Sequence, residues 1–482
     1  MNKILLLILV GLSSVKAQKA LDLATAVQLA KEQSVGAKIV QTTYSNKYWA
    51  YKSFKSNYLP QLSLNGTFPN LDRGLSSITL DDGSDTFIQR SLLSSTASVG
   101  MSQNIGLTGS TITVGSNVSR IDLLSSNPTT SYLFSPVSVS LRQPLFGFNS
   151  MKWNLKMEPV KFDIAKKAFN ENMEEVALQT ARMFFNVLVA DVRTEMAEKA
   201  LAMNDTLLKI TTGRYNLGKI AENELLQMKL QYMRSQADLE QAKLDRVMNI
   251  SRLKNHLGLD MNEELDLIIP QSIPEFTANL EMALTNAKLY RSDLDEFERQ
   301  RIDAEMQLAQ SRKNNSFSLD LYASYGLNVS GNTWDAINNT PDESQRFFIT
   351  ASVPIVDWGK GKASVKTAEA MKELVELQNK QGLEQFEQDV ILAVNYFNMK
   401  RTNLQNAILA DDIAQKQFNV TVQRFKIGKI GIIELNQSIT QRDNAKSNYL
   451  SSLMDFWISY YDLRLKSLYD FETESPIDYL QM

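Results

Sequence analysis

The sequence contains no cysteine among its 482 residues and a single histidine, His256. Without cysteine there is no disulfide framework, no thiol nucleophile, no cysteine-based zinc or iron–sulfur site and no lipid-modified cysteine. One histidine leaves too little material for a His-rich metal site or a Ser-His-Asp triad, and we interpret His256 as structural. We therefore expect no catalytic residue, no cofactor and no metal, and a protein that is not an enzyme.

Long apolar runs and a strong charge of one sign are also lacking. The mean hydropathy is −0.24, with 43% hydrophobic and 22% charged residues, which indicates a folded chain and not a bundle of transmembrane helices. The formal net charge of −3 makes nucleic acid a poor partner. The length fits two or three ordinary domains or one large repeated architecture.

The first seventeen residues have the pattern of a secretory signal peptide. A basic start at Lys3 is followed by the apolar run 4–12 and by small residues up to Ala17. The run is too short to span a bilayer as a helix. The alternative is a buried N-terminal strand. We expect cleavage after Ala17 and export of the mature chain.

Long segments have the periodicity of helices. Residues 165–212 contain no proline or glycine, and apolar residues recur every three or four positions. Similar segments cover 222–257, 277–312, 363–425 and 431–469. A helix of roughly 60 residues is about 90 Å long and needs long partners, so coiled-coil-like packing is expected.

Other segments alternate with period two, for example 62–68, 95–105, 111–120, 137–142, 317–322 and 346–352. One face of each is apolar and the other carries small polar residues. Such strands fit a membrane barrel with a wet lumen, although a soluble sandwich shows the same alternation. Aromatic residues near strand ends favour the membrane, with core anchors as the alternative for each; they are Phe146, Phe148, Trp153 and Trp358.

An internal repeat organises the whole chain. The segment 214–220 (RYNLGKI) recurs 210 residues later as 424–430 (RFKIGKI). The earlier strand residues Leu62 and Leu64 recur after 257 residues as Leu319 and Leu321. The first repeat covers 18–270, with short helices, strands at about 58–145 and a helix hairpin at about 158–257. The second covers 271–482, with strands at about 316–355 and a hairpin at about 361–470. The expected fold is mainly α with a β-barrel.

The first repeat holds about 47 extra residues between its strands. They fit one added strand pair, 95–105 and 111–121, joined by a tight turn at 106–109. The pair belongs either to the barrel or to an excursion outside it, so four or six strands per chain remain open. The segments 69–93 and 122–136 are expected to be exposed loops.

The order and duplication of these motifs resemble the TolC-like outer membrane efflux family. The long insertion in the first repeat and the stretch 141–153 resemble versions common among Bacteroidetes. The resemblance rests on 21–30, on 58–64, on the strand-to-helix junctions 142–147 and 353–359, and on the two tip motifs. It implies a homotrimer in the cell outer membrane with a large periplasmic part. Each chain would give strands to one lipid-embedded β-barrel and long antiparallel hairpins to one periplasmic α-barrel. A periplasmic adaptor and an inner-membrane pump are the implied partners.

The same resemblance places a periplasmic aperture near Glu434, where family members carry an aspartate. A second family aspartate corresponds here to Gln437, and the family's tip arginine corresponds to Ile430. Glu224 is the first-repeat counterpart of Glu434. The alternative for Glu434 is a solvated carboxylate that favours the helix dipole.

The hairpin ends are the candidate adaptor-docking tips, because a partner below the tunnel reaches them first. They contain Gly218 and Lys219 in the first repeat and Gly428 and Lys429 in the second. The alternative is an ordinary turn whose glycine caps the helix. The arginines that precede the turns, Arg214 and Arg424, are expected to bond across the tip or to hold the last helix carbonyls.

Together these features predict a passive exit duct for drugs, metals or a secreted polypeptide in a tripartite efflux or type I secretion system. The alternatives are a coiled-coil structural or adhesive surface protein and a periplasmic hydrolase. The heptads of the first would run uninterrupted to a terminus and its strands would not be duplicated. The second needs a convergent acid, base and nucleophile, which the scattered Asp, Glu and Ser residues do not mark.

Overall fold

The computed structural model describes residues 19–124, 128–263, 265–270, 272–427 and 429–480. Contacts divide the chain into two compact units, each drawn from both repeats. The strand unit comprises Ser45–Ala165 and Ser292–Glu384. The hairpin unit comprises the described residues of Met1–Tyr44, Lys166–Arg291 and Gln385–Met482. No helix among the described residues is both long and apolar enough to cross a membrane.

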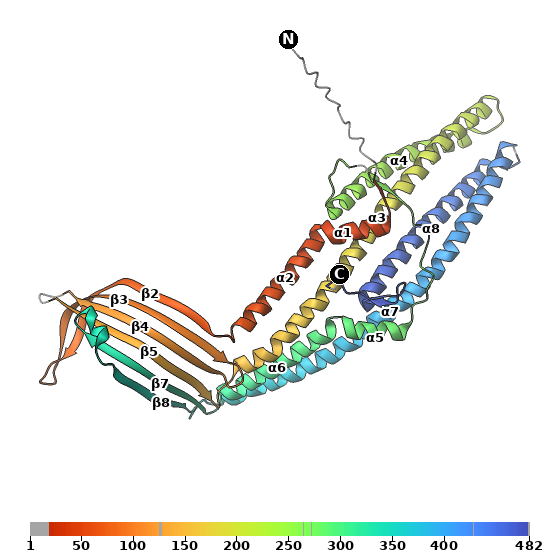
Figure 1. The fold of residues 1–482 in the computed structure, drawn as a ribbon. Coiled ribbons are helices and arrows are strands. Elements are labelled where there is room, and N and C mark those ends of the chain that lie inside the picture. Colours follow the sequence, from red (N-terminus) through yellow and green to blue (C-terminus); the bar gives the residue numbers. More distant parts are fainter. Residues whose placement is uncertain (1–18, 125–127, 264, 271, 428, 481–482) are drawn as a thin grey trace, which may run out of the picture. The chain divides into compact units, whose positions relative to one another are not determined.

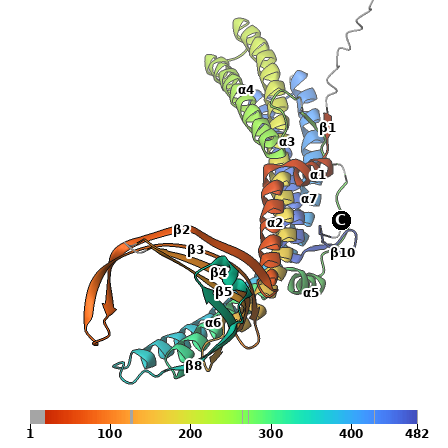
Figure 2. The same ribbon diagram turned by 60° about the vertical axis from the view of Figure 1, so that its left-hand side comes forward.

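The strand unit contains one antiparallel sheet of six strands in the order β2-β3-β4-β5-β7-β8 (Figure 1). Their bounds are Gln61–Thr79, Asp85–Ile105, Ser110–Leu123, Thr129–Leu145, Ser318–Gly331 and Asp342–Ser352. The strands of the second repeat continue the sheet of the first, because β5 pairs with β7. The added pair, β3 and β4, lies inside this sheet and not outside it. Figure 2 shows that the strands bend instead of lying flat.

The register keeps the two faces of the sheet chemically distinct. One row of directly paired small residues crosses all six strands, namely Ser63, Gly100, Gly115, Ser138, Gly326 and Ser344. The opposite face carries apolar side chains that stay exposed, such as Leu64 at 76% and Phe347 at 67%. A one-residue slip would exchange the two faces, so the pattern fixes the register.

The helices reproduce the repeat closely. The first copy has α1 Leu23–Gln33, α2 Val35–Ser56, α3 Ser150–Asn216 and α4 Glu222–Leu257. The second has α5 Leu280–Tyr290, α6 Asp293–Asn314, α7 Lys360–Lys426 and α8 Ile432–Ser467. Matching helices have equal lengths of 11, 22, 67 and 36 residues. The predicted mainly α fold with two internal repeats is confirmed.

Equivalent caps explain why the short helices begin where they do. The carboxylate of Asp22 accepts a hydrogen bond from the Thr25 backbone N–H at 2.7 Å, and the amide oxygen of Asn279 accepts one from Met282 N–H at 3.1 Å. Short strands complete the hairpin unit: β1 Lys19–Leu21 pairs with β6 Leu265–Leu267, and β9 Tyr469–Asp470 pairs with β10 Ser475–Pro476.

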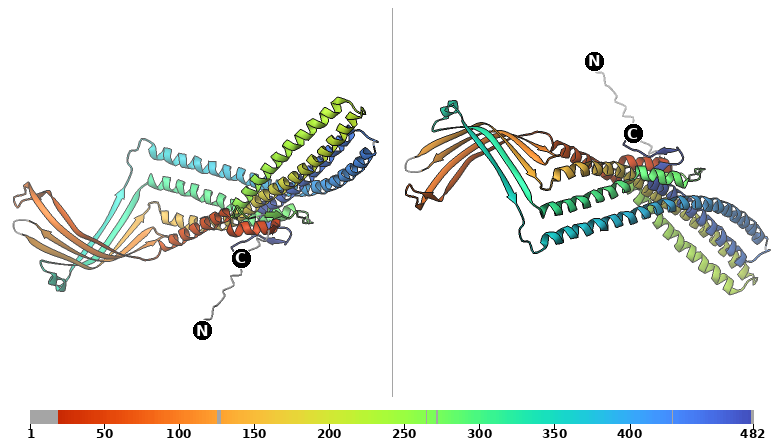
Figure 3. Two further views of the ribbon diagram at one scale, coloured as in Figure 1. Left: turned by 90° about the horizontal axis from the view of Figure 1, so that it is seen from above. Right: turned by 90° about the horizontal axis from the view of Figure 1, so that it is seen from below.

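The hairpin unit has a core of large side chains between its long helices, which Figure 3 shows running in antiparallel pairs. Four phenylalanines are fully buried there, namely Phe184, Phe185, Phe397 and Phe456. Phe397 lies 5.5 Å from Phe456, centroid to centroid, so helices α7 and α8 meet through aromatic contact.

Two expectations about local structure were wrong. The segment 277–312 is not one helix, because Arg291 is extended at ψ 151° and separates α5 from α6. The segment 69–93 is not a loop but the outer part of the β2–β3 hairpin. Its turn is made by Gly83 at φ +83° and by Asp82, whose carboxylate accepts a hydrogen bond from Ser84 N–H.

Two element starts also differ from expectation. Strand β5 begins at Thr129, inside the expected loop 122–136. Helix α3 begins at Ser150, eight residues before the expected hairpin start, and contains Pro159. Its start is fixed by Asn149, whose side-chain oxygen accepts a hydrogen bond from Lys152 N–H at 3.0 Å.

Candidate functional site

The first hairpin tip joins α3 to α4 through a glycine-capped turn. Gly218 has φ +66°, and its N–H donates to the Tyr215 carbonyl at 2.8 Å. The N–H of Lys219 donates to the Arg214 carbonyl at 2.9 Å. These two bonds form a Schellman motif, which satisfies helix carbonyls that would otherwise lack partners. The Lys219 side chain is exposed.

The second tip joins α7 to α8 and repeats the bond from the lysine N–H to the arginine carbonyl. The N–H of Lys429 donates to the Arg424 carbonyl at 3.0 Å, and both side chains are exposed. Gly428 lies outside the described residues. The sequence predicts that the arginines hold the last helix carbonyls. In both tips a backbone N–H group, that of Lys219 or Lys429, bonds the carbonyl of Arg214 or Arg424.

Side chains from both hairpins pack together close to the tips. A buried cluster contains Leu207 and Met228 from the first hairpin and Phe425 and Leu435 from the second. The guanidinium of Arg214 lies 5.4 Å from the centroid of the Phe425 ring. A cation over an aromatic face is attracted by the ring quadrupole. Arg214 thus contacts the neighbouring hairpin, so the two tips belong to one packed end of the hairpin unit.

The aperture candidates occupy the first turns of the returning helices. The carboxylate of Glu434 accepts a hydrogen bond from Gly431 N–H at 2.6 Å, at the N-terminus of α8. This contact satisfies an orphan donor and places negative charge at the positive end of the helix dipole. Gln437 is exposed three residues further on, and Glu224 is half-buried in the first turn of α4.

Glu434 and Gln437 lie on one face of α8, because residues three apart are neighbours on a helix surface. Glu434 is exposed, so its second carboxylate oxygen is free for solvent or an ion.

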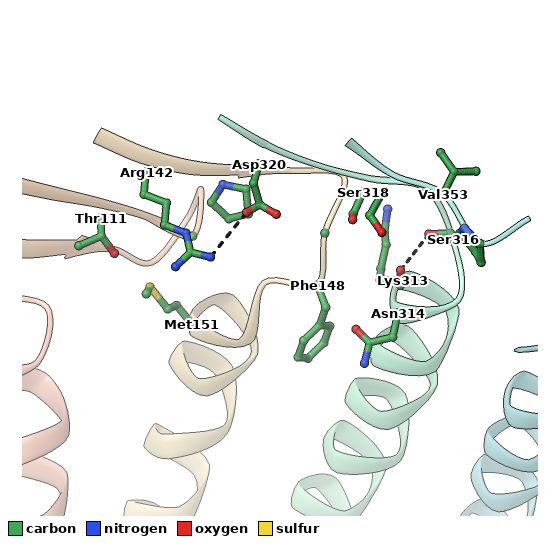
Figure 4. Close-up of a pocket in the computed structure, with 15 residues that line it drawn as sticks. Thr111, Arg142, Phe148, Met151, Lys313, Asn314, Ser316, Ser318, Asp320 and Val353 are labelled. Carbon is green, nitrogen blue, oxygen red and sulfur yellow. Dashed lines mark hydrogen bonds and ion pairs between the residues drawn. The ribbon is translucent and has the colours of Figure 1, made fainter. Parts of the chain in front are cut away.

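A pocket in the strand unit lies where β5 and β7 meet the helices. Figure 4 shows Arg142 and Asp320 facing each other above the ends of α3 and α6. Their guanidinium and carboxylate approach to 4.0 Å, with 73% and 45% of the side chains exposed. Their directly paired neighbours Pro144 and Tyr322 lie on the same face, which is that of the row of small residues. The pair therefore adds charge to the polar face of the sheet near its helical end.

Sequence reasoning missed a buried ionic cluster in the hairpin unit. The carboxylate of Glu174 on α3 is fully buried and accepts hydrogen bonds from Lys31 Nζ at 2.9 Å and Arg464 Nε at 3.0 Å. The hydroxyl of Tyr479 also donates to it, and Arg464 pairs with Asp470. The cluster joins α1, α3, α8 and the C-terminal segment.

The cluster holds Glu174 in its charged form. Burial by itself would raise the pKa of Glu174, but the charges of Lys31 and Arg464 and the hydrogen bonds from Arg464 and Tyr479 lower it to about 2. Burial raises the pKa of the Tyr479 hydroxyl, and the neighbouring Glu174 charge raises it further. No sequence signal identifies this cluster, since Lys31, Arg464 and Tyr479 lie 143, 290 and 305 residues from Glu174 in the chain.

His256 has a structural contact, with its Nε2 at 2.8 Å from Thr180 Oγ1 on α3, and burial lowers its pKa. Among the described residues, no group of three or more His, Cys, Asp or Glu side chains is placed to hold a metal ion.

The comparisons with known proteins agree with this architecture. No curated protein matches the chain. The chain has the fold of the outer membrane channel CmeC of Campylobacter jejuni, with a TM-score of 0.66 at 14% identity over 92% of this chain and 85% of that one. Vibrio cholerae VceC gives 0.64 at 10% identity over 92% and 95%, and Neisseria gonorrhoeae MtrE gives 0.61 at 15% over 92% and 88%.

A family model described as "Outer membrane efflux protein" matches residues 104–259 and 283–457. The two matches fall one in each repeat and together cover more than half of the chain. They include both hairpin tips and the strands that join the repeats. The chain therefore belongs to the outer membrane efflux protein family.

Proposed function

We propose that this protein is the passive outer-membrane exit duct of a tripartite efflux or type I secretion system, acting as a homotrimer. The observation that carries the proposal is a continuous sheet with one polar face and one exposed apolar face, attached to long helix hairpins. An apolar face of this extent is stable against lipid, and the polar face suits a wet lumen. The energy for transport is spent by a partner, and the duct has no catalytic role.

The exposed apolar face of the sheet also supports the proposed location in the outer membrane. The apolar side chains of the sheet contact outer-membrane lipid, and the hairpins extend into the periplasm. Aromatic side chains at the strand-to-helix junctions suit the membrane interface: Trp358 is 96% exposed and Phe146 is 61% exposed. The signal peptide 1–17, cleaved after Ala17, lies outside the described residues and supplies the route of export.

A periplasmic adaptor docks at the tips, and an inner-membrane pump feeds the duct through it. The tips present backbone turns and the exposed lysines Lys219 and Lys429, and the packing of Arg214 on Phe425 holds the two turns together. The exposed Glu434 and Gln437 lie on the returning helix and form the periplasmic aperture when three copies assemble. Glu224, which is half-buried, makes a smaller contribution.

Charge reversal at the tips tests the docking proposal. We expect Lys219→Glu together with Lys429→Glu to abolish export in cells while the purified protein keeps its trimeric size in detergent. The matched control is Lys416→Glu, which reverses an exposed lysine on α7 away from the tips. Normal export by the double variant would contradict docking at the tips.

Reconstitution tests the duct itself. The purified protein is expected to sediment as a trimer and to conduct ions in a planar bilayer. A monomer without conductance, also in the Glu434→Gln variant, would contradict the proposal.

A further inference from the structure

The sheet ends in two edges that the single chain leaves open. In the described part of the chain β2 has one neighbour, β3, and β8 has one neighbour, β7. Every residue of β8 is exposed, and so are the first fifteen residues of β2. An open edge presents unpaired N–H and C=O groups, which are not tolerated in a lipid-exposed position. Something must therefore pair with both edges.

We propose that β8 of one copy pairs with β2 of the next, so that three copies close a barrel of eighteen strands, six from each chain. This inference rests on the proposed homotrimer for its copy number. The occupant of each edge is a second copy of this chain.

The strand directions allow this closure without a mismatch. The strand β2 leaves the end of α2, and β8 runs back to the start of α7, so the two edges of one sheet run in opposite directions. Joining copies edge to edge then continues the antiparallel alternation of the sheet. An even number of strands per chain is required for this, and six satisfies it.

The side chains of the two edges are also in phase. On β2, Leu62 and Leu64 face one side and Ser63 faces the other. On β8, Phe347 and Ile349 lie on the apolar face, and Ser344 lies in the same row of small residues as Ser63. Pairing that aligns the rows leaves the apolar face continuous around the ring, as a lipid-embedded barrel needs.

A proline limits where the contact lies. Pro69 falls in the bulge of β2, between Thr67 and Asn70, and it has no N–H to donate. We place the pairing with β8 on the helical side of this bulge, in residues 61–68. Strand β8 has 11 residues, enough to cross the membrane at the usual tilt.

A smaller barrel is the competing arrangement. If β2 and β3 were outside the barrel, β8 of one copy would pair with β4 of the next, and three copies would give twelve strands. That arrangement would break the pairing of β3 with β4, which continues without a register shift from Ile105 and Ser110 to Leu92 and Leu123. It would also remove Val99 and Met101 from an apolar face that they share with Val114.

The strand number sets the width of the duct in the membrane. With strands ~4.8 Å apart and tilted by ~40°, eighteen strands enclose a backbone diameter of ~36 Å, against ~24 Å for twelve. Barrels of 16–18 strands leave an aqueous channel. The added pair β3–β4 therefore widens the exit.

Disulfide trapping tests the closure, because the chain has no native cysteine to confuse the result. Thr350→Cys on β8 is combined in turn with Ser63→Cys, Asn65→Cys or Thr67→Cys on β2, and the full-length protein is oxidised in outer membranes. The competing arrangement is probed by Thr350→Cys with Thr111→Cys or Thr113→Cys on β4. The matched control is Ser324→Cys with Arg346→Cys, which are directly paired within one chain.

We expect covalent dimers and trimers from at least one β8–β2 combination, none from the β8–β4 combinations, and only monomers from the control. Linkage of β8 to β4 would overturn the inference. An electron-microscopy section across the barrel counts the strands independently of the register chosen for the cysteines. Eighteen strands support the inference, and twelve overturn it.

The size of the protein in detergent distinguishes failure of the barrel closure from failure of the proposed function. A trimer with twelve strands overturns the barrel closure and leaves the proposed duct intact. A protein that is monomeric in membranes and in detergent overturns the proposed function, and the closure with it.

Discussion

Arg464 donates a hydrogen bond from Nε to Oε2 of Glu174 at 3.0 Å, and this pair joins α8 to α3 across 290 residues of sequence. Lys31 on α1 and Tyr479 in the C-terminal segment bond the other carboxylate oxygen. A single buried carboxylate therefore connects both repeats and both ends of the described chain. Because it is fully buried, its loss leaves cations without their counter-charge.

The first prediction concerns the stability of this cluster. Glu174→Ala is expected to lower the free energy of unfolding by about 3–5 kcal/mol, since breaking a buried ion pair leaves the remaining charge buried without a partner. Asp412→Ala is the matched control, because it removes an exposed partner of Lys416 and should cost less than about 1 kcal/mol. Denaturant unfolding in detergent measures both. Equal costs for the two variants would contradict the assigned role of the cluster.

The second prediction is a pH dependence. The pKa of Glu174 is about 2 in the folded protein against an ordinary value of 4.5, so the folded state binds this proton less readily than the unfolded state. The stabilisation is fully present above about pH 4.5 and is lost as pH falls toward 2. We expect the thermal midpoint to fall over this range more steeply than in Glu174→Gln. Parallel pH profiles for the two proteins would refute the assignment.

The third prediction compares two glycines near the end of α3. Gly218 has φ +66°, so Gly218→Ala should destabilise the tip by about 1–2 kcal/mol. Gly213 lies inside the helix with open space around its Cα, so Gly213→Ala should stabilise it by about 0.5–1 kcal/mol. Hydrogen exchange of the tip amides measures both changes. Effects of the same sign would show that the cap does not control the tip.

The fourth prediction concerns ion selectivity. Glu434→Gln keeps an oxygen that can accept the hydrogen bond from Gly431 N–H but removes the negative charge. If three copies of Glu434 line the aperture, the preference of the reconstituted channel for cations should fall several-fold. Glu224→Gln is the control and should change selectivity less, because Glu224 is half-buried. Reversal potentials in a salt gradient provide the measurement, and an unchanged value for Glu434→Gln would remove it from the aperture.

The candidate site was predictable in its backbone and not in its contacts. The glycine turn at Gly218 follows from a break in helical periodicity, which is a local signal. The contact of Arg214 with Phe425 has no such signal, because the two residues belong to different hairpins. The outer part of the β2–β3 hairpin was missed although Asp82 and Gly83 form a turn typical of hairpins. The polar composition of residues 69–93 led to the prediction of a loop in spite of this short motif.

The sequence by itself determined the repeated order of helices and strands. Helix length, helix ends and strand faces depend on the period of apolar residues and on capping groups a few residues away, and these recur at shifts of 210 and 257. Only the tertiary structure decided that β5 pairs with β7, that the added strands lie inside the sheet, and that Glu174 meets Lys31 and Arg464. Those contacts join residues far apart in the chain, and they form only when the packing of whole elements brings the partners together.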